Sequence, residues 1–445
     1  MLFSVDNFEK VLSTFYESTV FTIEAIERRE VYFTHAKWNE RHLTFSSVDE
    51  LRQKACDKPP LRLTHSLARY HDPGRRKNNG LVAEEMEKSG STFLPWTMAD
   101  KGYAGIDIGF DIDYDHLPGI TSYRHGLEQA KENALRLLGF LTNDLNMPIS
   151  AISFRFSGNR GYHMVVTEES LLRLGKEERT GIEDYVRGHD MHLSGFIHTS
   201  TDKGAWSNKG GHFEYSLYTP PTPGWGGKFT KTFIEMIDEY RSLPDDETRL
   251  ALLKKWTPIH QDIKNSIFNR PSFMTNSGEP AKRKMKKPTY MGIHDFFMND
   301  YALTGLSRDW RLSHWAKVSS MKPTAVKRLI EMVIQQTQLR RGVEADAITK
   351  DLHRQLRTPG SLHTTSGMPC VEITYEMLQD IDLMFDHVRE TVGKDAVEVE
   401  VKHEVYVHAL DRTVYPGTYK VPRYEAYSIV CAEYQYLQHL DEETE

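Results

Sequence analysis

Apolar residues recur at two different spacings along the chain, and the spacing changes from one segment to the next. Residues 5–29 and 122–147 carry apolar side chains every three or four positions, which predicts one or two helices in the first segment and one in the second. Residues 30–45 contain two runs of aromatic and β-branched residues separated by AKWNE, which favours a pair of strands. The patterns of 104–114 and 149–156 predict two further strands.

The middle of the chain has a different character. Residues 169–290 combine helical segments with loops rich in proline and glycine, so we predict an inserted, largely helical subdomain. It would divide a core formed by 1–168 and 291–435, in which strand patterning returns after the insertion. The final segment, 436–445, is expected to be a disordered acidic tail. The predicted fold class is α/β of the α+β kind, with antiparallel or mixed sheets flanked by helices.

Composition narrows the class of protein. The chain has 445 residues, of which 39% are hydrophobic, so it can bury a substantial core in two or three domains. A net charge of −7 excludes a uniformly basic nucleic-acid binder but leaves local patches open, such as the loop 71–80 and the run 281–288. Cys56, Cys370 and Cys431 form no CxxC pair, which indicates a reducing compartment. No signal peptide or apolar run of membrane length is visible, so we expect an intracellular soluble protein.

The segment GFDIDYDH places aspartates on a predicted strand, although aspartate is disfavoured in strands. With a period of two, Asp107, Asp111 and Asp113 lie on one face and apolar residues on the other. Neighbouring carboxylates repel each other, and a divalent cation between them reverses that repulsion. Asp111 and Asp113 are therefore a candidate half-site for two-metal phosphoryl transfer, with Asp107 and Asp115 as neighbours. A solvated acidic strand face is the alternative.

The segment FSGNRGYH interrupts two strands with a glycine turn. Gly158 and Gly161 permit backbone conformations in which successive N–H groups point to one place. Ser157, Arg160 and His163 add side-chain donors, and the arginine supplies a fixed positive charge. The turn is a candidate receptor for a polyphosphate, and an ordinary hairpin loop with polar residues is the alternative.

A third segment, 344–367, carries similar chemistry. Arg354, Arg357 and His363 offer hydrogen-bond donors on either side of a turn at Pro359 and Gly360. A carboxylate from this segment would complete a metal site with the aspartate strand, and the candidates are Glu344, Asp346 and Asp351. A capped helix followed by a loop is the alternative.

In their order along the chain, these segments resemble the small catalytic subunit family of archaeal and eukaryotic DNA primases, and the archaeal type most. GFDIDYDH resembles the family's metal-binding DxD strand, and FSGNRGYHMVV is similar to its SGxxGxH nucleotide-binding motif. RQLRTPGSLHTTSG resembles the archaeal segment with a basic residue followed by Pro-Gly-Ser-Leu-His. ERREVYF with RHLTF looks like the early Arg-Glu strand motif, and YKVPRYEAYSIV is similar to the C-terminal end.

The resemblance spans about 27–168 and 340–435, whereas 196–340 matches nothing that we can place. It implies a primase-type core of mixed α/β structure and antiparallel strands, with a helical subdomain. It also implies roles for individual residues. Those expected to contact the nucleotide are Arg29, Ser157, Gly158, Arg160, His163, Arg357 and His363.

By the same resemblance, Asp111 and Asp113 would bind two Mg²⁺ or Mn²⁺ ions. Counting back from the Pro-Gly-Ser-Leu-His turn, the family's third metal-binding aspartate would fall on Ala345, which cannot bind a metal. We favour the adjacent Asp346 as the third ligand, with Glu344 and Asp351 as the alternatives. Where most members carry a zinc knuckle, HLPGITSYRHGLEQ offers two histidines, His116 and His125, and no cysteine, so no structural zinc is expected.

The implied reaction is template-directed synthesis of short RNA primers from nucleoside triphosphates, and synthesis of DNA is left open. The implied partners are a single-stranded DNA template and a large primase subunit in a heterodimer. The large subunit would be a separate chain, because this chain lacks the cysteines of an iron–sulfur subunit. The implied location is the cytoplasm of an archaeal cell. The gene could belong to the archaeon itself or to a virus or plasmid of such a host. Two alternatives stand beside this interpretation: a primase-polymerase of a mobile element or repair pathway that acts alone, and a catalytically weak nucleic-acid-binding replication protein.

Overall fold

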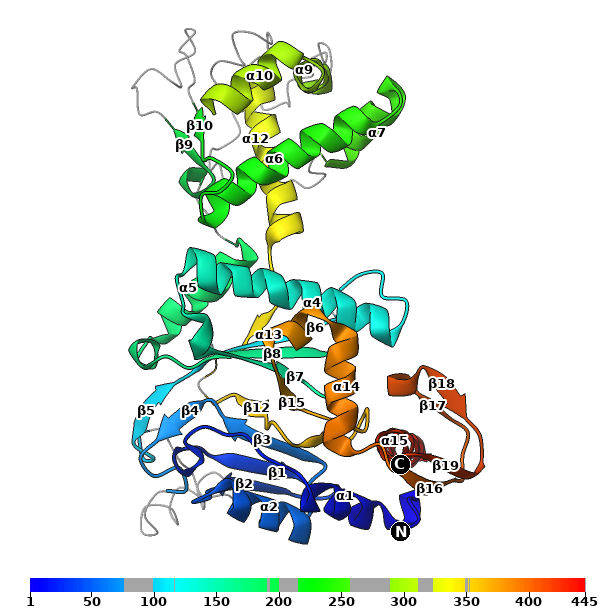
Figure 1. Ribbon diagram of the computed structural model, residues 1–445. Coiled ribbons are helices and arrows are strands. Elements are labelled where there is room, and N and C mark those ends of the chain that lie inside the picture. Colours follow the sequence, from blue (N-terminus) through cyan, green and yellow to red (C-terminus); the bar gives the residue numbers. More distant parts are fainter. Residues whose placement is uncertain are drawn as a thin grey trace, which may run out of the picture. The chain divides into compact units, whose positions relative to one another are not determined.

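The computed structural model describes residues 1–75, 99–115, 117–189, 193–199, 215–256, 289–310, 323–348, 351 and 353–444. The chain forms two compact units, the first made of Met1–Leu138, Met147–Glu183 and Glu344–Glu445 and the second of Gly139–Asn146 and Asp184–Val343. Helices and antiparallel sheets occur together in the first unit (Figure 1), which confirms the predicted α/β fold of the α+β kind. Within these ranges, no helix has both the length and the apolar composition needed to cross a membrane.

The sheet that carries the predicted site has five strands in the order β11-β6-β8-β7-β15, and neighbouring strands are antiparallel. The strands are β11 (Asp346–Ala347), β6 (Ile108–Asp113), β8 (Gly161–Val166), β7 (Ile152–Phe156) and β15 (Val371–Ile373). In β6 the apolar residues Ile108, Phe110 and Ile112 are buried, so the alternation in the sequence produces one packed face and one polar face. β7 and β8 are the strands predicted on either side of the glycine turn.

The strand predicted over 104–114 is two strands in the structure. β5 (Tyr103–Ile106) pairs with β4 (Ala68–Tyr70), whereas β6 pairs with β8. The break falls at Asp107, whose buried carboxylate accepts hydrogen bonds from Arg29 at 2.5 Å and from Arg69 at 2.9 Å. This ion pair holds the Asp107 carboxylate inside the protein at the point where the chain changes partners.

A second sheet has four strands in the order β12-β3-β1-β2. The strands are β12 (Gln355–Arg357), β3 (Arg62–Ser66), β1 (Val31–Thr34) and β2 (Asn39–Leu43). β1 and β2 are antiparallel neighbours, which confirms the strand pair predicted over 30–45.

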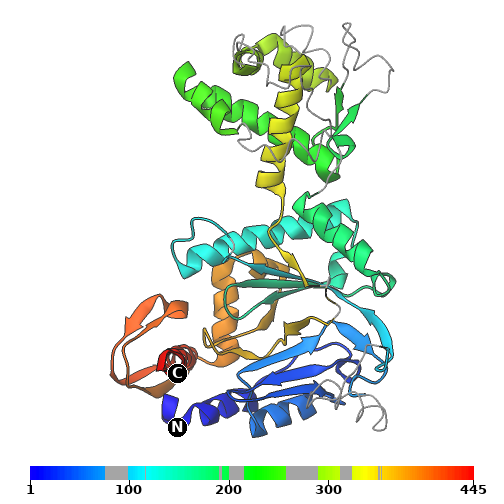
Figure 2. The same cartoon turned by 180° about the vertical axis from the view of Figure 1, so that it is seen from behind.

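Helices cover the outer sides of the two sheets. α4 (Tyr123–Gly139) lies on the outer side of the five-stranded sheet, and α1 (Phe8–Glu17) and α2 (Val48–Asp57) lie on the outer side of the four-stranded sheet (Figures 1 and 2). The polar face of β6 therefore faces the space between the sheets. The close approach of Gly109 to Leu67 agrees with this, because a Cβ on Gly109 would come within 2.5 Å of Leu67 Cδ1.

The predicted helices are shorter than their patterns. In 5–29, α1 buries Phe8, Val11, Leu12 and Phe15, which fall at the i, i+3, i+4, i+7 spacing of one helical face. In 122–147, α4 ends at Gly139 and a single π-helical turn follows over Phe140–Asp144. A further helix, α5 (Lys176–Arg187), follows β8.

Among the described residues, the C-terminal part of the first unit adds three strand pairs and three helices. β13 (Leu362–His363) pairs with β14 (Met368–Pro369). β16 (Ala396–Val401) pairs with β19 (Gly417–Pro422), and β17 (Val405–Val407) pairs with β18 (Arg412–Val414). The helices are α13 (Tyr375–Gln379), α14 (Ile381–Val392) and α15 (Arg423–Thr444). The segment 436–445, expected to be a disordered tail, is therefore helical as far as Thr444. Leucine, glutamine and glutamate are good helix formers and extend α15 into the acidic segment.

The second unit is mainly helical. Its elements are β9 (Ile197–Thr199), β10 (Tyr215–Leu217), α6 (Gly224–Ser242), α7 (Asp246–Trp256), α9 (Thr289–Phe297), α10 (Asp300–Asp309) and α12 (Pro323–Arg341). It extends over 184–343, whereas the sequence placed the insertion at 169–290. The difference arises because α9 and α12 pack against α6: the Phe233 and Phe297 rings are 6.2 Å apart, and Arg341 donates to Thr232.

Candidate active site

A cavity of about 240 Å³ lies between the two sheets of the first unit. It is lined from one sheet by β6, β8 and the turn before β8, and from the other by β3 and β12. The structure brings seven of the expected residues to this cavity: Asp111, Asp113, Ser157, Arg160, His163, Arg357 and His363. Three segments far apart in the sequence thus meet at one place.

The sheet register brings a third carboxylate to the aspartate strand. Asp346 on β11 lies directly opposite Asp111 on β6. Side chains opposite each other on antiparallel strands have Cβ atoms about 4.5–5.5 Å apart. Of the alternatives, Asp351 accepts hydrogen bonds from the backbone amide and ring of its neighbour His353. The one-residue offset seen in the sequence is therefore compatible with Asp346 standing beside Asp111.

The surroundings of Asp111 disfavour its negative charge. Burial, followed by the charges of Asp113, Asp346 and Asp115, raises the pKa of Asp111 to about 7. Its Oδ1 atom is buried and has no hydrogen-bond partner within the part of the chain that the structure describes. A buried carboxylate oxygen without a partner is costly, and a cation would offset this cost.

The donor set fits Mg²⁺ or Mn²⁺, because both ions prefer carboxylate oxygens. Within the described ranges, no three acidic, histidine or cysteine side chains already stand in an arrangement that would hold a metal ion. The three carboxylates would have to turn towards the ion when it binds. The side chains of Asp111 and Asp113 are only partly exposed, and Asp346 is exposed at the edge of the sheet.

The glycine turn is closed by the hydroxyl of Ser157, which accepts hydrogen bonds from the backbone amides of Asn159 and Gly161. A hydroxyl that accepts two hydrogen bonds still has its own proton to donate. Gly158 has φ +87°, in the left-handed region that favours glycine. A Cβ on Gly161 would come within 1.9 Å of the Ile112 carbonyl oxygen, so only glycine allows β8 to pair this closely with β6.

Basic and imidazole side chains gather on the other side of the cavity. Burial, followed by the charge of Arg62, lowers the pKa of Arg357 to about 10. Burial and the nearby Arg357 hold the pKa of His363 well below its usual range. His363 Nδ1 accepts a hydrogen bond from the Thr365 amide, so the proton of the neutral ring is on Nε2. The cavity therefore has an acidic side suited to cations and a basic side suited to anions.

His163 lies between these two sides. It is opposite Asp111 in the sheet, and its Nε2 atom is 3.5 Å from Asp111 Oδ1. Burial, followed by the charge of Arg155, lowers the pKa of His163 to about 3. The ring is therefore neutral near pH 7 and can donate a hydrogen bond without adding a fixed charge.

Arg160 is at the cavity but is engaged with carboxylates. Its guanidinium lies 2.9 Å from Asp115 and 4.0 Å from Asp113, and its side chain is half exposed. An exposed ion pair contributes little to stability, so Arg160 can exchange these carboxylates for a phosphate at small cost.

Arg29 is not part of this cavity. Besides its ion pair with Asp107, it donates to the backbone carbonyls of Glu24, Ser66 and Leu67. All of its donor nitrogens are thus used inside the protein. The expectation that Arg29 contacts the nucleotide finds no geometric support, and its place is a structural one.

Sequence reasoning missed Arg62 as a lining residue and named Arg354 only as a general donor. Arg354 lies near the carboxylates and lowers the pKa of Asp111. Arg62 stands at the start of β3, in a segment without a motif. It reaches the cavity only because β3 pairs with β12, and no local pattern in the sequence indicates that pairing.

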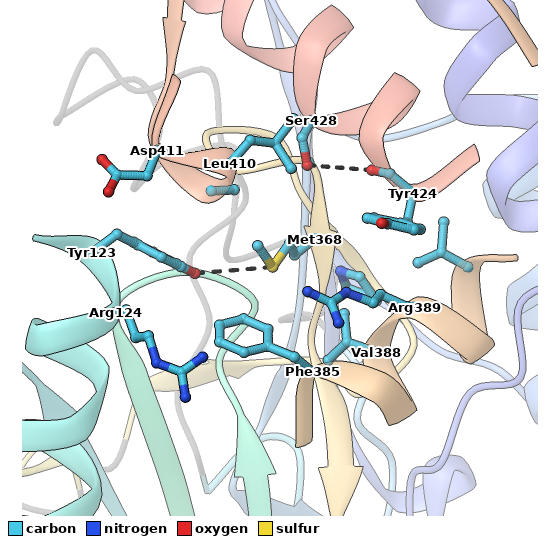
Figure 3. A pocket seen from close by; sticks show the side chains of 14 residues that line it. Tyr123, Arg124, Met368, Phe385, Val388, Arg389, Leu410, Asp411, Tyr424 and Ser428 are labelled. Atoms are coloured by element: carbon cyan, nitrogen blue, oxygen red, sulfur yellow. Dashed lines mark hydrogen bonds between the residues drawn. The ribbon is translucent and has the colours of Figure 1, made fainter. Parts of the chain in front are cut away.

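Tyr123 and Met368 line a further cavity (Figure 3), and Tyr123 also contacts the glycine turn. The Tyr123 hydroxyl donates to the Asn159 carbonyl at 2.7 Å and also approaches the Met368 sulfur. Ser366 donates to the Gly158 carbonyl. These contacts fix the backbone of the glycine turn. They come from residues that do not themselves line the candidate active site.

Other candidates lie outside the described residues. These are His116, the basic run 281–288 and most of the loop 71–80, of which the structure describes the part up to the exposed Arg75.

Comparison with known proteins places this chain in a family. A profile of the family described as DNA primase small subunit matches residues 110–375, more than half of the chain. The chain is 30% identical to "DNA primase small subunit PriS" of Methanothrix thermoacetophila over 369 residues, which cover 81% of this chain and 79% of that protein. It is 29% identical to the protein of the same name from Halobacterium salinarum, covering 74% and 75%, and 26% identical to that of Methanocella arvoryzae, covering 95% and 96%. This chain belongs to the DNA primase small subunit family.

Proposed function

We propose that this protein synthesises short primers on a single-stranded DNA template by two-metal nucleotidyl transfer in the cavity between its two sheets. Membership of the family supports a primase catalytic subunit. The observation that supports the finer proposal is the sheet register, in which Asp346 lies opposite Asp111. Asp111 itself lines the same cavity as Arg357 and His363. Carboxylates for cations and basic groups for phosphates are what this reaction needs.

In this proposal, the carboxylates bind the metal ions. Asp111, Asp113 and Asp346 would hold the ions, and Arg354 would offset the remaining negative charge near Asp111. When bound, the ions would lower the pKa of the attacking 3′-hydroxyl and neutralise charge on the leaving diphosphate. The high pKa of Asp111 means that, without a cation, the site disfavours three ionised carboxylates, so cation binding would be coupled to their ionisation.

The basic side would orient the triphosphate. Arg357 and Arg62 supply positive charge, and His363 Nε2–H and the Ser157 hydroxyl supply directed donors. Arg160 would leave Asp115 and pair with a phosphate oxygen, for which its planar guanidinium is suited. His163 would donate as a neutral ring beside Asp111.

Two further parts of the proposal concern the product and the partners. We propose RNA as the product. We also propose a large primase subunit as a partner, because the relatives are named small subunits. An enzyme that acts alone on a mobile element or in repair would form primers without that partner.

The test is synthesis without a pre-existing primer. The purified chain is incubated with single-stranded DNA, Mg²⁺ or Mn²⁺, and either ribonucleotides or deoxyribonucleotides, with and without a large subunit. We expect template-dependent products from the wild type and a loss of at least about a hundredfold in Asp113→Asn, in line with the removal of a charge-stabilising group. If both proteins formed equal amounts of product, the proposed site would be wrong. If neither formed product under any condition, the protein would be a nucleic-acid-binding relative instead.

A further inference from the structure

The first unit contains a second polar cavity, of about 300 Å³, that shares no lining residue with the candidate active site. Arg155 and Glu372 line it from β7 and β15, and Arg29, His65 and Asp107 line it from the facing elements. Its size is at the lower end of the range found for small-molecule sites, about 300–1,000 Å³. The proposed function uses none of these residues.

The side chain of Arg155 indicates that this cavity binds a ligand. Its residue exposure is 7%, yet its Nε and Nη1 atoms have no hydrogen-bond partner within the described part of the chain. The nearest carboxylate oxygen, on Glu372, is 3.7 Å from Nε, beyond hydrogen-bond distance. A buried guanidinium with unused donors is costly unless an acceptor is present.

The buried charges around the cavity do not balance. Arg29, Arg69 and Arg155 are buried, and the buried carboxylate among them is that of Asp107. Both oxygens of Asp107 are already taken, one by Arg29 and the other by Arg69.

Two further carboxylates are near the cavity but face solvent. The side chains of Glu24 and Glu372 are 63% and 43% exposed. Water screens their charges much more than it screens a buried charge. Arg155 therefore has no buried counter-charge of its own.

We propose that this second cavity is an oxyanion site in which Arg155 binds a phosphate group. Phosphate accepts several hydrogen bonds from a guanidinium and carries the charge that this region lacks. The hydroxyls of Ser150 and Thr167 also line the cavity and are additional donors. The phosphate belongs to a small species, either the free ion, a diphosphate, or the phosphate of a mononucleotide. This inference does not rest on the proposed function.

The site lies one strand away from the candidate active site. Arg155 is opposite His163 in the sheet, and His163 is opposite Asp111. Binding at the two sites must therefore be separated in any experiment, and the separate sets of lining residues make this possible.

The test is calorimetric titration of the full-length chain with inorganic phosphate, diphosphate and a nucleoside monophosphate, in the presence of a chelator. We expect at least one of these anions to lose about tenfold or more of its affinity in Arg155→Met, because a charge-assisted hydrogen bond is removed. Arg155→Met should cause the same loss when it is introduced into Arg357→Met, in which the active-site cavity has lost a basic group.

A second variant keeps the proposal testable if Arg155→Met fails to fold. Glu372→Gln removes the carboxylate that competes for Arg155 at the partly exposed edge of the cavity, so it should tighten binding of the same anion. The anion should also raise the unfolding temperature of the wild type and not that of folded Arg155→Met.

The proposal is overturned by any of three results. One is equal affinity of folded Arg155→Met and wild type for all three anions. Another is weaker or unchanged binding in Glu372→Gln. The third is binding that depends on Arg357 alone, because the anion would then occupy the candidate active site.

Discussion

Asp111 is the residue on which the chemistry of the candidate site depends most. Its Oδ1 atom is buried without a hydrogen-bond partner in the described ranges. Burial, followed by the charges of three further aspartates, raises its pKa. A protein gains no stability from such an arrangement. A divalent cation would offset this cost, and this is the reason to propose Asp111 as a ligand.

The raised pKa of Asp111 gives a pH dependence that can be measured without substrate. In the metal-free protein, the folded pKa of about 7 exceeds the ordinary value of 3.8, so the native state binds this proton more tightly than the unfolded state does. The contribution of protonated Asp111 to stability is present below about pH 4 and is lost as pH rises through about 7. We expect Asp111→Asn, which stays neutral, to unfold at a higher temperature than the wild type at pH 8 and to lose this advantage at pH 4.

Thermal unfolding with a chelator at several pH values checks this expectation. Adding Mg²⁺ at pH 8 should stabilise the wild type and leave Asp111→Asn nearly unchanged. Parallel curves for the two proteins over the whole pH range would contradict the interpretation.

Arg62 offers a second test at the residue scale, because no motif indicates it. It lines the cavity and its charge lowers the pKa of Arg357, so the charge acts in the region where the triphosphate is expected. Arg62→Ala should raise the KM for nucleotide about tenfold and leave the fold intact. Arg52→Ala is the matched control, since Arg52 is a half-exposed arginine on α2 that pairs with Asp49. Steady-state kinetics with both variants would show whether the effect belongs to Arg62.

At the scale of elements, the site depends on how closely β6 and β8 approach. The glycine turn lets β8 start at Gly161, directly opposite Asp113. This pairing fixes the spacing between the aspartate strand and the donors of the turn. The elements behind the turn, including Tyr123 on α4, then hold it in place (Figure 3).

Gly161→Ala tests this pairing. The new methyl group would meet the Ile112 carbonyl oxygen at 1.9 Å, so the strands must separate locally. We expect a loss of about 1–3 kcal/mol in the free energy of unfolding, together with a fall in nucleotide affinity. Gly181→Ala, on α5, is the control, since nothing lies within 4 Å of its added Cβ and alanine favours helix. An equal effect of the two substitutions on unfolding by denaturant would count against the pairing as the cause.

The sequence indicated local features well and distant pairings poorly. Alternation in β6 and the glycines before β8 are short-range patterns, and the structure has strands and a turn at those places. The break at Asp107 was missed because its cause is an ion pair with Arg29 and Arg69, which are distant in the sequence. Arg62 was missed for the same reason, since its place depends on the pairing of β3 with β12.

At the scale of the whole molecule, the candidate site is assembled from parts that the chain separates widely. Asp111 and Asp346 are neighbours across two strands, although the residues of the helical unit, 184–343, come between them in sequence. The fold of the first unit must therefore form across this insertion before the three carboxylates meet. A test of Asp346 is for that reason a test of the complete arrangement.

The most direct test compares Asp346→Asn with Glu344→Gln in primer synthesis by the full-length chain. Both substitutions remove one negative charge from neighbouring positions in the same segment, and only Asp346 lies opposite Asp111. We expect Asp346→Asn to lose at least about a hundredfold in rate and to bind Mn²⁺ more weakly, while Glu344→Gln stays close to the wild type. Equal activity of Asp346→Asn and the wild type, or a greater loss in Glu344→Gln, would contradict the proposed metal site.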